Sequence, residues 1–244
     1  MGFVESAPKL TVSVSVVIPV HNEEDILVET TEAVLNGFRE MSDVQLRDLI
    51  LSENGSRDRT RELAGSLAAD HGEIMVIISD RADYGAAMRR GFAAARGECI
   101  VNFDADYYDF EFVAAALKVE ADIVVAAKNI EGSADARVLV RRVGSRCFAW
   151  LVRRSLGIKT TETHGIKLYR RRAIEDILEQ VRSGKDLFDT ELVARAELAG
   201  LRVVELPIAT KEMRHSRSGI LRRIPRTLLG LLVLRYRLRP IRKR

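Results

Sequence analysis

The sequence predicts an α/β fold, with a mostly parallel central sheet and helices on both faces. Short apolar runs alternate four times with segments of helical period, and three of the loops that follow the apolar runs carry acidic or polar residues. This alternation is typical of parallel sheets, whose ligands bind at the carboxyl ends of the strands. The 244 residues, 47% of them apolar, are enough to bury a full core. We expect one domain over residues 1–210 and a basic extension over 211–244.

Each element is justified by its periodicity and by the residues that end it. The first half is expected to alternate strands and helices over Val12–Ile18, Glu24–Phe38, Leu46–Leu51, Thr60–Ala69, Ile74–Ile78, Ala86–Ala95 and Cys99–Phe103. The second half is expected to hold a helix over Val138–Leu156, a short strand over Ile166–Tyr169, a helix over Asp189–Ala199 and a strand over Val203–Leu206. Gly200 is typical of a helix C-cap, and Pro207 closes the last strand.

Composition and charge indicate the cellular compartment and the kind of binding partner. The two cysteines have no metal-ligand spacing, and the start of the chain has no signal-peptide pattern, so we expect a reduced cytoplasmic location. No apolar run approaches the roughly 20 residues that span a bilayer. Of the 39 Lys and Arg residues, 12 lie in residues 211–244, together with one acid, Glu212. This basic tail indicates an anionic partner, either nucleic acid or a membrane surface.

The tail pattern favours the membrane. Apolar residues recur at helical spacing among the arginines: Ile220, Leu221, Ile224, Leu228, Leu231 and Leu232. Such a helix is typical of peripheral attachment at the inner face of the membrane. Tyr236 is the tail's one aromatic residue and no nucleic-acid motif is present, so we expect no nucleic-acid partner. A structural helix docked on a partner subunit stays open, and with it a homo-oligomer.

Two aspartates end the fourth expected strand. Asp104 and Asp106 follow Cys-Ile-Val-Asn-Phe, and like charges this close need a cation or another partner. Carboxylate oxygens suit Mg²⁺ or Mn²⁺, which complete their coordination with phosphate oxygens of a substrate. The pair therefore predicts a metal site at the sheet edge.

Several motifs in order resemble family 2 glycosyltransferases of the GT-A fold. They are Val-Val-Ile-Pro-Val-His-Asn-Glu-Glu, Glu-Asn-Gly-Ser-Arg-Asp, Tyr-Gly-Ala-Ala-Met-Arg-Arg-Gly-Phe, Phe-Asp-Ala-Asp, His-Gly-Ile-Lys-Leu-Tyr-Arg-Arg and Phe-Asp-Thr-Glu-Leu-Val-Ala-Arg-Ala-Glu. The likeness covers about residues 13 to 210 and is greatest to polyprenyl-phosphate sugar transferases such as dolichyl-phosphate mannose and glucose synthases. It implies a Rossmann-like nucleotide-binding half joined to an acceptor half.

The resemblance implies a nucleotide site at the ends of the first strands. Its expected members are Pro19, Val20, His21, Glu23, Glu53, Asn54, Asp83, Tyr84, Gly85, Arg89 and Asp104. Glu53 and Asn54 stand where the family commonly has two aspartates, which leaves the base open between UDP and GDP. Gly85 would let the backbone approach the nucleotide closely.

The resemblance also implies transfer of a hexose, with inversion, from the nucleotide sugar to a polyprenyl phosphate or another membrane-associated acceptor. Asp104 and Asp106 are expected to hold the metal and diphosphate. Asp189, and second to it Glu162, are candidates for an acid near the acceptor, where a hydroxyl acceptor would need a base and an ionised phosphate would not. Candidates for acceptor phosphate binding are His164, Arg171, Arg214 and Arg217.

Two other functions stay open. A nucleotidyltransferase also places acids after a parallel strand, although no Gly-rich, Lys-containing phosphate loop follows the first strand. A member of the same fold that binds nucleotide sugar without turnover is the second, because of the Glu53-Asn54 departure.

Overall fold

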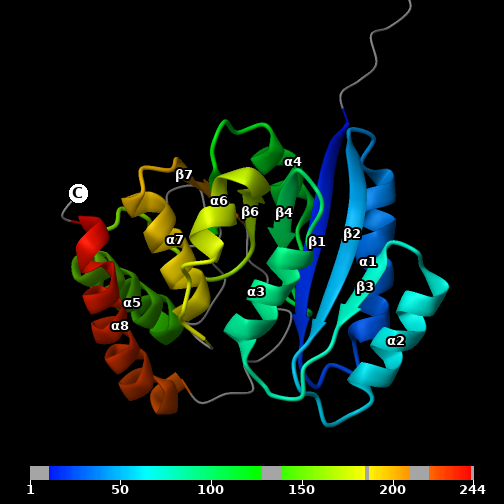
Figure 1. Cartoon of the computed structure of the whole chain (residues 1–244), viewed down its shortest axis with the longest axis horizontal. Coiled ribbons are helices and arrows are strands. Elements are labelled where there is room, and N and C mark those ends of the chain that lie inside the picture. The colour runs from blue at the N-terminus through cyan, green and yellow to red at the C-terminus, as the bar shows by residue number, and fades with distance from the viewer. Residues whose placement is uncertain (1–10, 128–138, 185–186, 209–219, 243–244) are drawn as a thin grey trace, which may run out of the picture.

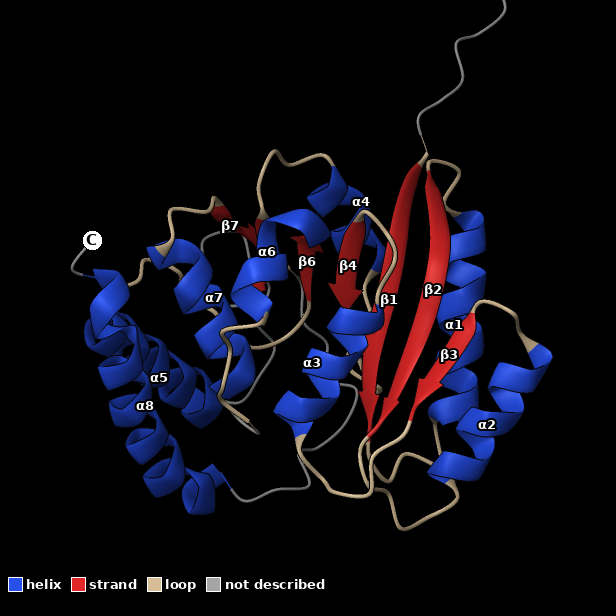
Figure 2. Ribbon diagram, in the orientation of Figure 1, coloured by secondary structure: helices blue, strands red, loops and turns tan. Residues whose placement is uncertain are grey.

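The computed structural model describes residues 11–127, 139–184, 187–208 and 220–242. One sheet crosses the molecule, with helices on both of its faces (Figures 1 and 2). Its strands are β1 Val12–Val20, β2 Val44–Glu53, β3 Ile74–Ile77, β4 Cys99–Asn102, β5 Ile123–Ala127, β6 Lys167–Arg170 and β7 Val203–Pro207. The helices are α1 Leu27–Glu40, α2 Thr60–Asp70, α3 Tyr84–Ala94, α4 Phe110–Leu117, α5 Leu139–Leu156, α6 Arg171–Leu178, α7 Phe188–Leu198 and α8 Ile220–Arg242.

The strand order is β3-β2-β1-β4-β6-β5-β7, and β6 alone runs against its neighbours. The expected mostly parallel sheet is confirmed. Because β1 pairs in parallel with both β2 and β4, the loops that follow these three strands leave the sheet at one edge. The reversed β6 begins at that edge, since Lys167 pairs with Asn102 at the end of β4.

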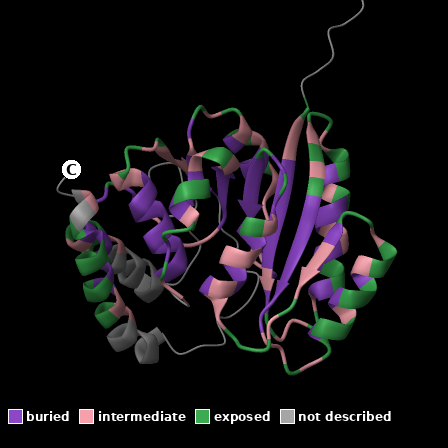
Figure 3. Cartoon of the chain, in the orientation of Figure 1, coloured by how far each residue is buried: buried purple, intermediate pink, exposed green. Residues whose placement is uncertain are grey.

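The apolar core is divided by the sheet, as the burial colouring in Figure 3 shows for the central strands. Val16 and Ile18 belong to the cluster on the face of α1, whereas Val17 between them belongs to the cluster on the face of α3. Successive side chains of a strand point to opposite faces, so β1 contributes to both cores. The strands that carry the site loops are thereby fixed from both sides.

Helix α8 belongs to the folded body. Its residues Leu231, Leu234 and Leu238 are buried in a third cluster with Val152 and Leu156 of α5. The predicted boundary between residues 210 and 211 lies outside the described residues. None of the described helices is both long and apolar enough to cross a bilayer.

Candidate active site

The acidic loop after β4 is held on both sides. Asp104 and Tyr107 exchange backbone hydrogen bonds, with N···O distances of 3.1 and 3.2 Å. Ala105 is buried, and its carbonyl accepts a 2.7 Å hydrogen bond from the Thr30 hydroxyl of α1. Asp104 is half-buried and Asp106 is exposed. The loop therefore presents two carboxylates from an anchored backbone at the carboxyl edge of the sheet.

The negative charge of Asp104 contributes to raising the pKa of two tyrosines, Tyr84 and Tyr107. Burial, followed by the charges of Asp189 and Asp104, raises the pKa of Tyr84 well above its usual value. Burial, followed by the charges of Asp109 and Asp104, raises the pKa of Tyr107 to about 12. Both phenols are therefore protonated at neutral pH and can donate a hydrogen bond. Asp109 itself caps α4, since its side chain accepts a hydrogen bond from the Phe112 amide.

A continuous set of hydrogen bonds joins the first loops of this edge. The His21 ring nitrogen Nδ1 lies 2.8 Å from the Asn54 carbonyl oxygen. The Asn54 side-chain oxygen accepts a 2.6 Å hydrogen bond from the Asp83 amide, directly before α3. The loops after β1 and β2 and the start of α3 are thus one assembly, and the nucleotide-binding candidates His21, Asn54 and Asp83 are brought together.

Lys167, which no sequence pattern marked as a site residue, joins the loop before β6 to the start of α7. Its ammonium group lies 3.2 Å from Asp189 Oδ1 and donates to the Gly165 carbonyl at 2.7 Å. Asp189 Oδ2 accepts a 2.8 Å hydrogen bond from the Tyr84 hydroxyl. Lys167 is fully buried and Asp189 is 3% exposed. Both oxygens of the preferred candidate base are therefore engaged, and Asp189 links α7 to β6 and α3.

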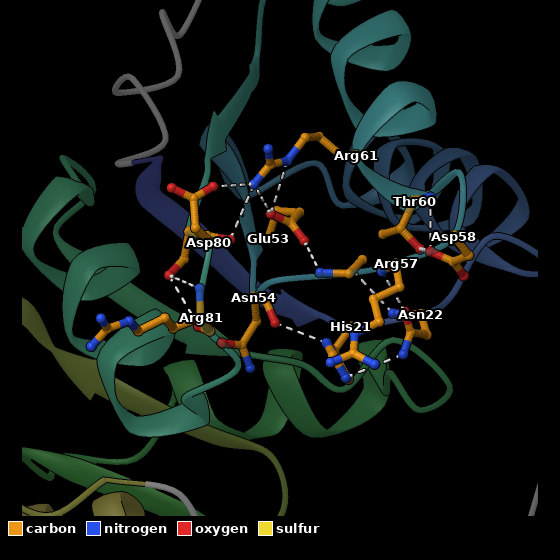
Figure 4. Close-up of polar contacts among 12 residues, drawn as sticks. His21, Asn22, Glu53, Asn54, Arg57, Asp58, Thr60, Arg61, Asp80 and Arg81 are labelled. Carbon is orange, nitrogen blue, oxygen red and sulfur yellow. Dashed lines mark hydrogen bonds and ion pairs between the residues drawn. The ribbon is translucent and has the colours of Figure 1, made fainter.

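A buried carboxylate, Glu53, shapes the loop after β2 (Figure 4). Its Oε1 accepts from the Ser56 amide at 2.5 Å, and its Oε2 lies 3.4 Å from the guanidinium of Arg61. The same guanidinium forms an ion pair with Asp80 at 3.0 Å. Since the Glu53 side chain is fully buried and both of its oxygens are engaged, it positions the loop, and the adjacent Asn54 joins that loop to His21 and Asp83.

Glu23 organises the loop after β1 through its backbone. Its amide donates to the Thr60 hydroxyl at 2.8 Å, and its carbonyl accepts from the amides of Ile26 and Leu27. Pro19 is half-buried at the end of the strand. Val20 is fully buried in the core cluster, so its side chain does not fit the predicted role in lining a nucleotide pocket.

Gly85 and Arg89 face protein rather than open space. A Cβ at Gly85 would lie 2.7 Å from the Cα of Gly184, and Arg89 donates to the Ser183 carbonyl at 2.8 Å. The close approach that the structure shows at Gly85 is between α3 and the 183–184 backbone, whereas the approach of Gly85 to a nucleotide stays a prediction. The physical reason for the approach in the structure is packing of two chain segments.

The loop before β6 carries two further candidates. Glu162 accepts a 3.2 Å hydrogen bond from the His164 amide, and its own amide donates to Glu205 of β7 at 2.7 Å. The neighbouring Gly165 carbonyl accepts from the Asn102 amide group at the end of β4. Glu162 and His164 thus lie in a loop at the correct edge, half-buried.

The candidate Arg171 does not lie at this edge. Arg171 follows the far end of β6, where its Nε donates to the Gly97 carbonyl and its guanidinium pairs with Glu175. Because Cys99 pairs with Arg170, about six residue steps, or roughly 20 Å, separate Arg171 from Asp104 along the strands. The predicted role of Arg171 in binding acceptor phosphate does not fit this position. Arg214 and Arg217 lie outside the described residues.

The donor set of the acidic loop fits a hard divalent ion. No group of three or more His, Cys, Asp or Glu side chains in the described part of the chain is arranged to enclose a metal. Two carboxylates on one loop are instead what Mg²⁺ or Mn²⁺ uses when substrate phosphates and water supply the other ligands.

Comparison with known proteins decides the family. The glycosyl transferase family 2 model matches residues 15–178. The chain belongs to glycosyl transferase family 2. Glycosyltransferase AglD of Haloferax volcanii is 30% identical over 220 residues, which are 87% of this chain and 35% of that protein. Dolichyl-phosphate β-glucosyltransferase ALG5A of Trichomonas vaginalis is 26% identical over 224 residues, 86% of this chain and 69% of that protein.

Solved structures support the GT-A fold. A mannosyltransferase from Pyrobaculum calidifontis, in complex with GDP-mannose and Mn²⁺, has a TM-score of 0.63 at 19% identity and covers 96% of this chain and 68% of its own. Glucosyl-3-phosphoglycerate synthase from Mycobacterium tuberculosis, in complex with UDP, has a TM-score of 0.62 at 19% identity and covers 92% and 80%. The expected family and fold are confirmed, and divalent metals accompany nucleotide ligands among such neighbours.

Proposed function

We propose that this family 2 chain transfers a hexose from a UDP- or GDP-linked sugar to a polyprenyl phosphate or another membrane-associated acceptor. The observation that supports it most is that the Asp104–Asp106 loop leaves the sheet at the same edge as the hydrogen-bonded His21 and Asn54, and that the charge of Asp104 acts on Tyr84. The relatives include enzymes named for dolichyl-phosphate and undecaprenyl-phosphate acceptors.

The leaving group determines what this edge has to supply. Displacing a nucleoside diphosphate from the anomeric carbon builds negative charge on the phosphates. A divalent ion held by Asp104 and Asp106 would neutralise part of that charge as a Lewis acid. The hydrogen bonds of Asn54 with His21 and Asp83 would hold the nucleoside-binding loops in place before the substrate binds.

The state of Asp189 favours a phosphate acceptor. A hydroxyl acceptor needs a base within hydrogen-bond reach, but Asp189 already pairs with Lys167 and accepts from Tyr84. An ionised phosphate monoester needs no deprotonation before it attacks the anomeric carbon. We therefore assign Asp189 a positioning role, in which it fixes the start of α7 against β6 and α3.

Helix α8 supports attachment at a membrane surface. Opposite its buried face it exposes a second apolar stripe, made of Leu228, Leu229, Leu232, Val233 and Tyr236. Trp150 of α5, the helix that packs on α8, is also 66% exposed. An exposed apolar stripe among arginines is typical of a helix in the membrane interface, here on the cytoplasmic side.

The decisive experiment measures sugar transfer and nucleotide binding together. We expect purified protein with Mn²⁺ to transfer hexose from UDP- or GDP-sugar to a short-chain polyprenyl phosphate. Asp104→Ala and Asp106→Ala should each reduce the rate by at least about 100-fold, whereas Asp70→Asn at the exposed end of α2 should leave it unchanged. Transfer that survives both alanine variants would refute the proposal. Nucleotide binding without turnover would favour the inactive module.

A further inference from the structure

A groove of about 420 Å³ lies between α8 and the segment that precedes α7. Leu229, Val233 and Arg237 form its wall on α8; they are spaced four residues apart and so occupy one row of the helix. Arg182 lies on the opposite wall, with Ser183 and Gly184. The groove therefore has an apolar row and two guanidinium groups.

The positive groups of the groove have no carboxylate partner among the described residues. Arg182 and Arg237 are exposed, and neither forms an ion pair with a residue that the structure describes. Asp83 also lines the groove, but its Oδ1 accepts from the Ala86 amide at the start of α3, where the helix dipole offsets its charge. The groove thus suits an anionic group beside an apolar chain.

The groove also adjoins the proposed nucleotide site. Asp83 donates its amide to the Asn54 side chain, and the next residue, Tyr84, donates its hydroxyl to Asp189. Leu187, two residues before Asp189, is another lining residue, and it packs where a Cβ on Gly230 would lie, 2.4 Å from its Cδ1. A ligand in the groove would therefore touch the same segment that supports the transfer site.

We propose that this groove binds the acceptor as a lipid monophosphate. Arg182 and Arg237 meet the phosphate, since guanidinium groups match phosphate oxygens in geometry and charge. The hydrocarbon chain lies along Leu229 and Val233, which are 64% and 42% exposed. A soluble phosphate acceptor would gain nothing from this apolar row, so we commit to the lipid. The inference rests on the proposed transfer to a membrane acceptor and names its binding residues.

The test uses the full chain and a soluble lipid phosphate, so that membrane binding does not interfere. Farnesyl monophosphate, below its micelle concentration, is titrated by calorimetry into wild type and into Arg182→Gln, Arg237→Gln and Arg235→Gln. Arg235 is the matched control, because it is an exposed arginine on α8 that does not line the groove. Inorganic phosphate and 3-phosphoglycerate serve as ligands without the chain, and UDP or GDP with Mn²⁺ is titrated into the same samples.

We expect Arg182→Gln and Arg237→Gln each to weaken farnesyl monophosphate binding about tenfold, and Arg235→Gln less than about twofold. Chain-free phosphates should bind wild type at least about tenfold more weakly. Equal losses in all three variants, or chain-free phosphate binding as tight as farnesyl monophosphate, would overturn the groove assignment. If the wild type binds farnesyl monophosphate but neither UDP nor GDP with Mn²⁺, the result would instead overturn the proposed sugar transfer and retain the groove as a lipid phosphate site.

Discussion

Replacing Lys167 by methionine tests whether the buried ion pair organises the active-site edge. Methionine keeps most of the length and volume of the side chain but removes the ammonium group. Asp189 would then lose its contact at 3.2 Å and keep the Tyr84 hydroxyl as its donor. Lys167 is fully buried and Asp189 is 3% exposed, so water does not replace the lost charge.

The magnitude follows from burial. Removing one partner of a buried ion pair costs about 3–5 kcal/mol, and the lost hydrogen bond to the Gly165 carbonyl adds about 1 kcal/mol. We therefore expect Lys167→Met to lower the free energy of unfolding by about 4–6 kcal/mol. Lys167→Met combined with Asp189→Asn removes both charges and keeps a partner for Tyr84, so the double variant should lose no more than the single one.

Urea denaturation at pH 7 of wild type, both single variants and the double variant measures this cycle. The reasoning fails if the two single losses simply add in the double variant, because then the two groups are not coupled. It also fails if Lys167→Met unfolds at the wild-type urea concentration. Where the variants remain folded, transfer should fall while the affinity for nucleotide with Mn²⁺ changes less, since Asp189 contacts the proposed nucleotide site through Tyr84, which keeps its acceptor in Lys167→Met and in the double variant.

Three further predictions concern stability and the membrane. Burial favours the neutral form of Asp48, yet hydrogen bonds from Arg96 and Ser15 hold its pKa below 3.8, so its ionised form stabilises the fold fully above pH 3.8 and this stabilisation is lost as the pH falls through the lower folded pKa. Asp48→Asn should therefore make the free energy of unfolding, measured by urea denaturation from pH 2 to 7, fall less steeply at acid pH; an unchanged acid dependence would contradict this. Gly85→Ala should lower the free energy of unfolding by about 1–3 kcal/mol because its Cβ meets backbone 2.7 Å away, whereas Gly65→Ala, with nothing within 4 Å, should raise it by about 0.5–1 kcal/mol. Thermal and urea unfolding measure both variants, and equal effects would show that the contact between Gly85 and Gly184 is absent. The fluorescence of Trp150, the single tryptophan, should shift to shorter wavelength when anionic vesicles are added in low salt, and should not shift with neutral vesicles. Identical spectra with the two kinds of vesicle would count against membrane attachment.

The alternating half of the fold was predictable because its strands and helices have clear periods and clear ends. The expected strand Cys99–Phe103 is β4, which ends one residue earlier, at Asn102. Helix α1 begins at Leu27 rather than Glu24, because the amides of Ile26 and Leu27 are bonded to the Glu23 carbonyl in the preceding turn. Such an end depends on local hydrogen bonds that periodicity does not reveal.

Three elements of the second half were missed. Helices α4 and α6 are only eight residues long, too short to show a helical period clearly, and β5 is an apolar run buried on both sides. The reversed direction of β6 depends on its pairing with β4 and β5, which no local pattern fixes. These elements nevertheless decide the site, since the reversal brings the Gly165 loop beside the end of β4 and sends Arg171 away.

The site candidates that lay directly after strands were placed correctly at one edge, whereas their individual contacts needed coordinates. Spacing marked Asp104 and Asp106, but it did not show that Asp189 is paired with Lys167. One signal was present: a lysine in the apolar strand Ile-Lys-Leu-Tyr must find a buried counter-charge, and an acid such as Asp189 is the natural partner. Arg61 carried no comparable signal, because its partner Glu53 becomes buried only when β2 packs in the sheet.

Under the proposed function, helix α8 would connect the membrane to the transfer site. Its inner face fills the cluster with α5 and α7, its outer face exposes apolar side chains, and Leu229 and Val233 of that outer face line the groove together with Arg237. Gly230 lets the helix pack directly on Leu187, at the start of α7, where Asp189 is fixed by Lys167. Because Leu187 lines the groove directly before α7 and Asp189 of α7 pairs with Lys167, a helix seated in the interface would present the lipid phosphate to an edge already assembled. A water-soluble acceptor would contact neither the exposed apolar side chains of α8 nor the apolar row of Leu229 and Val233 in the groove.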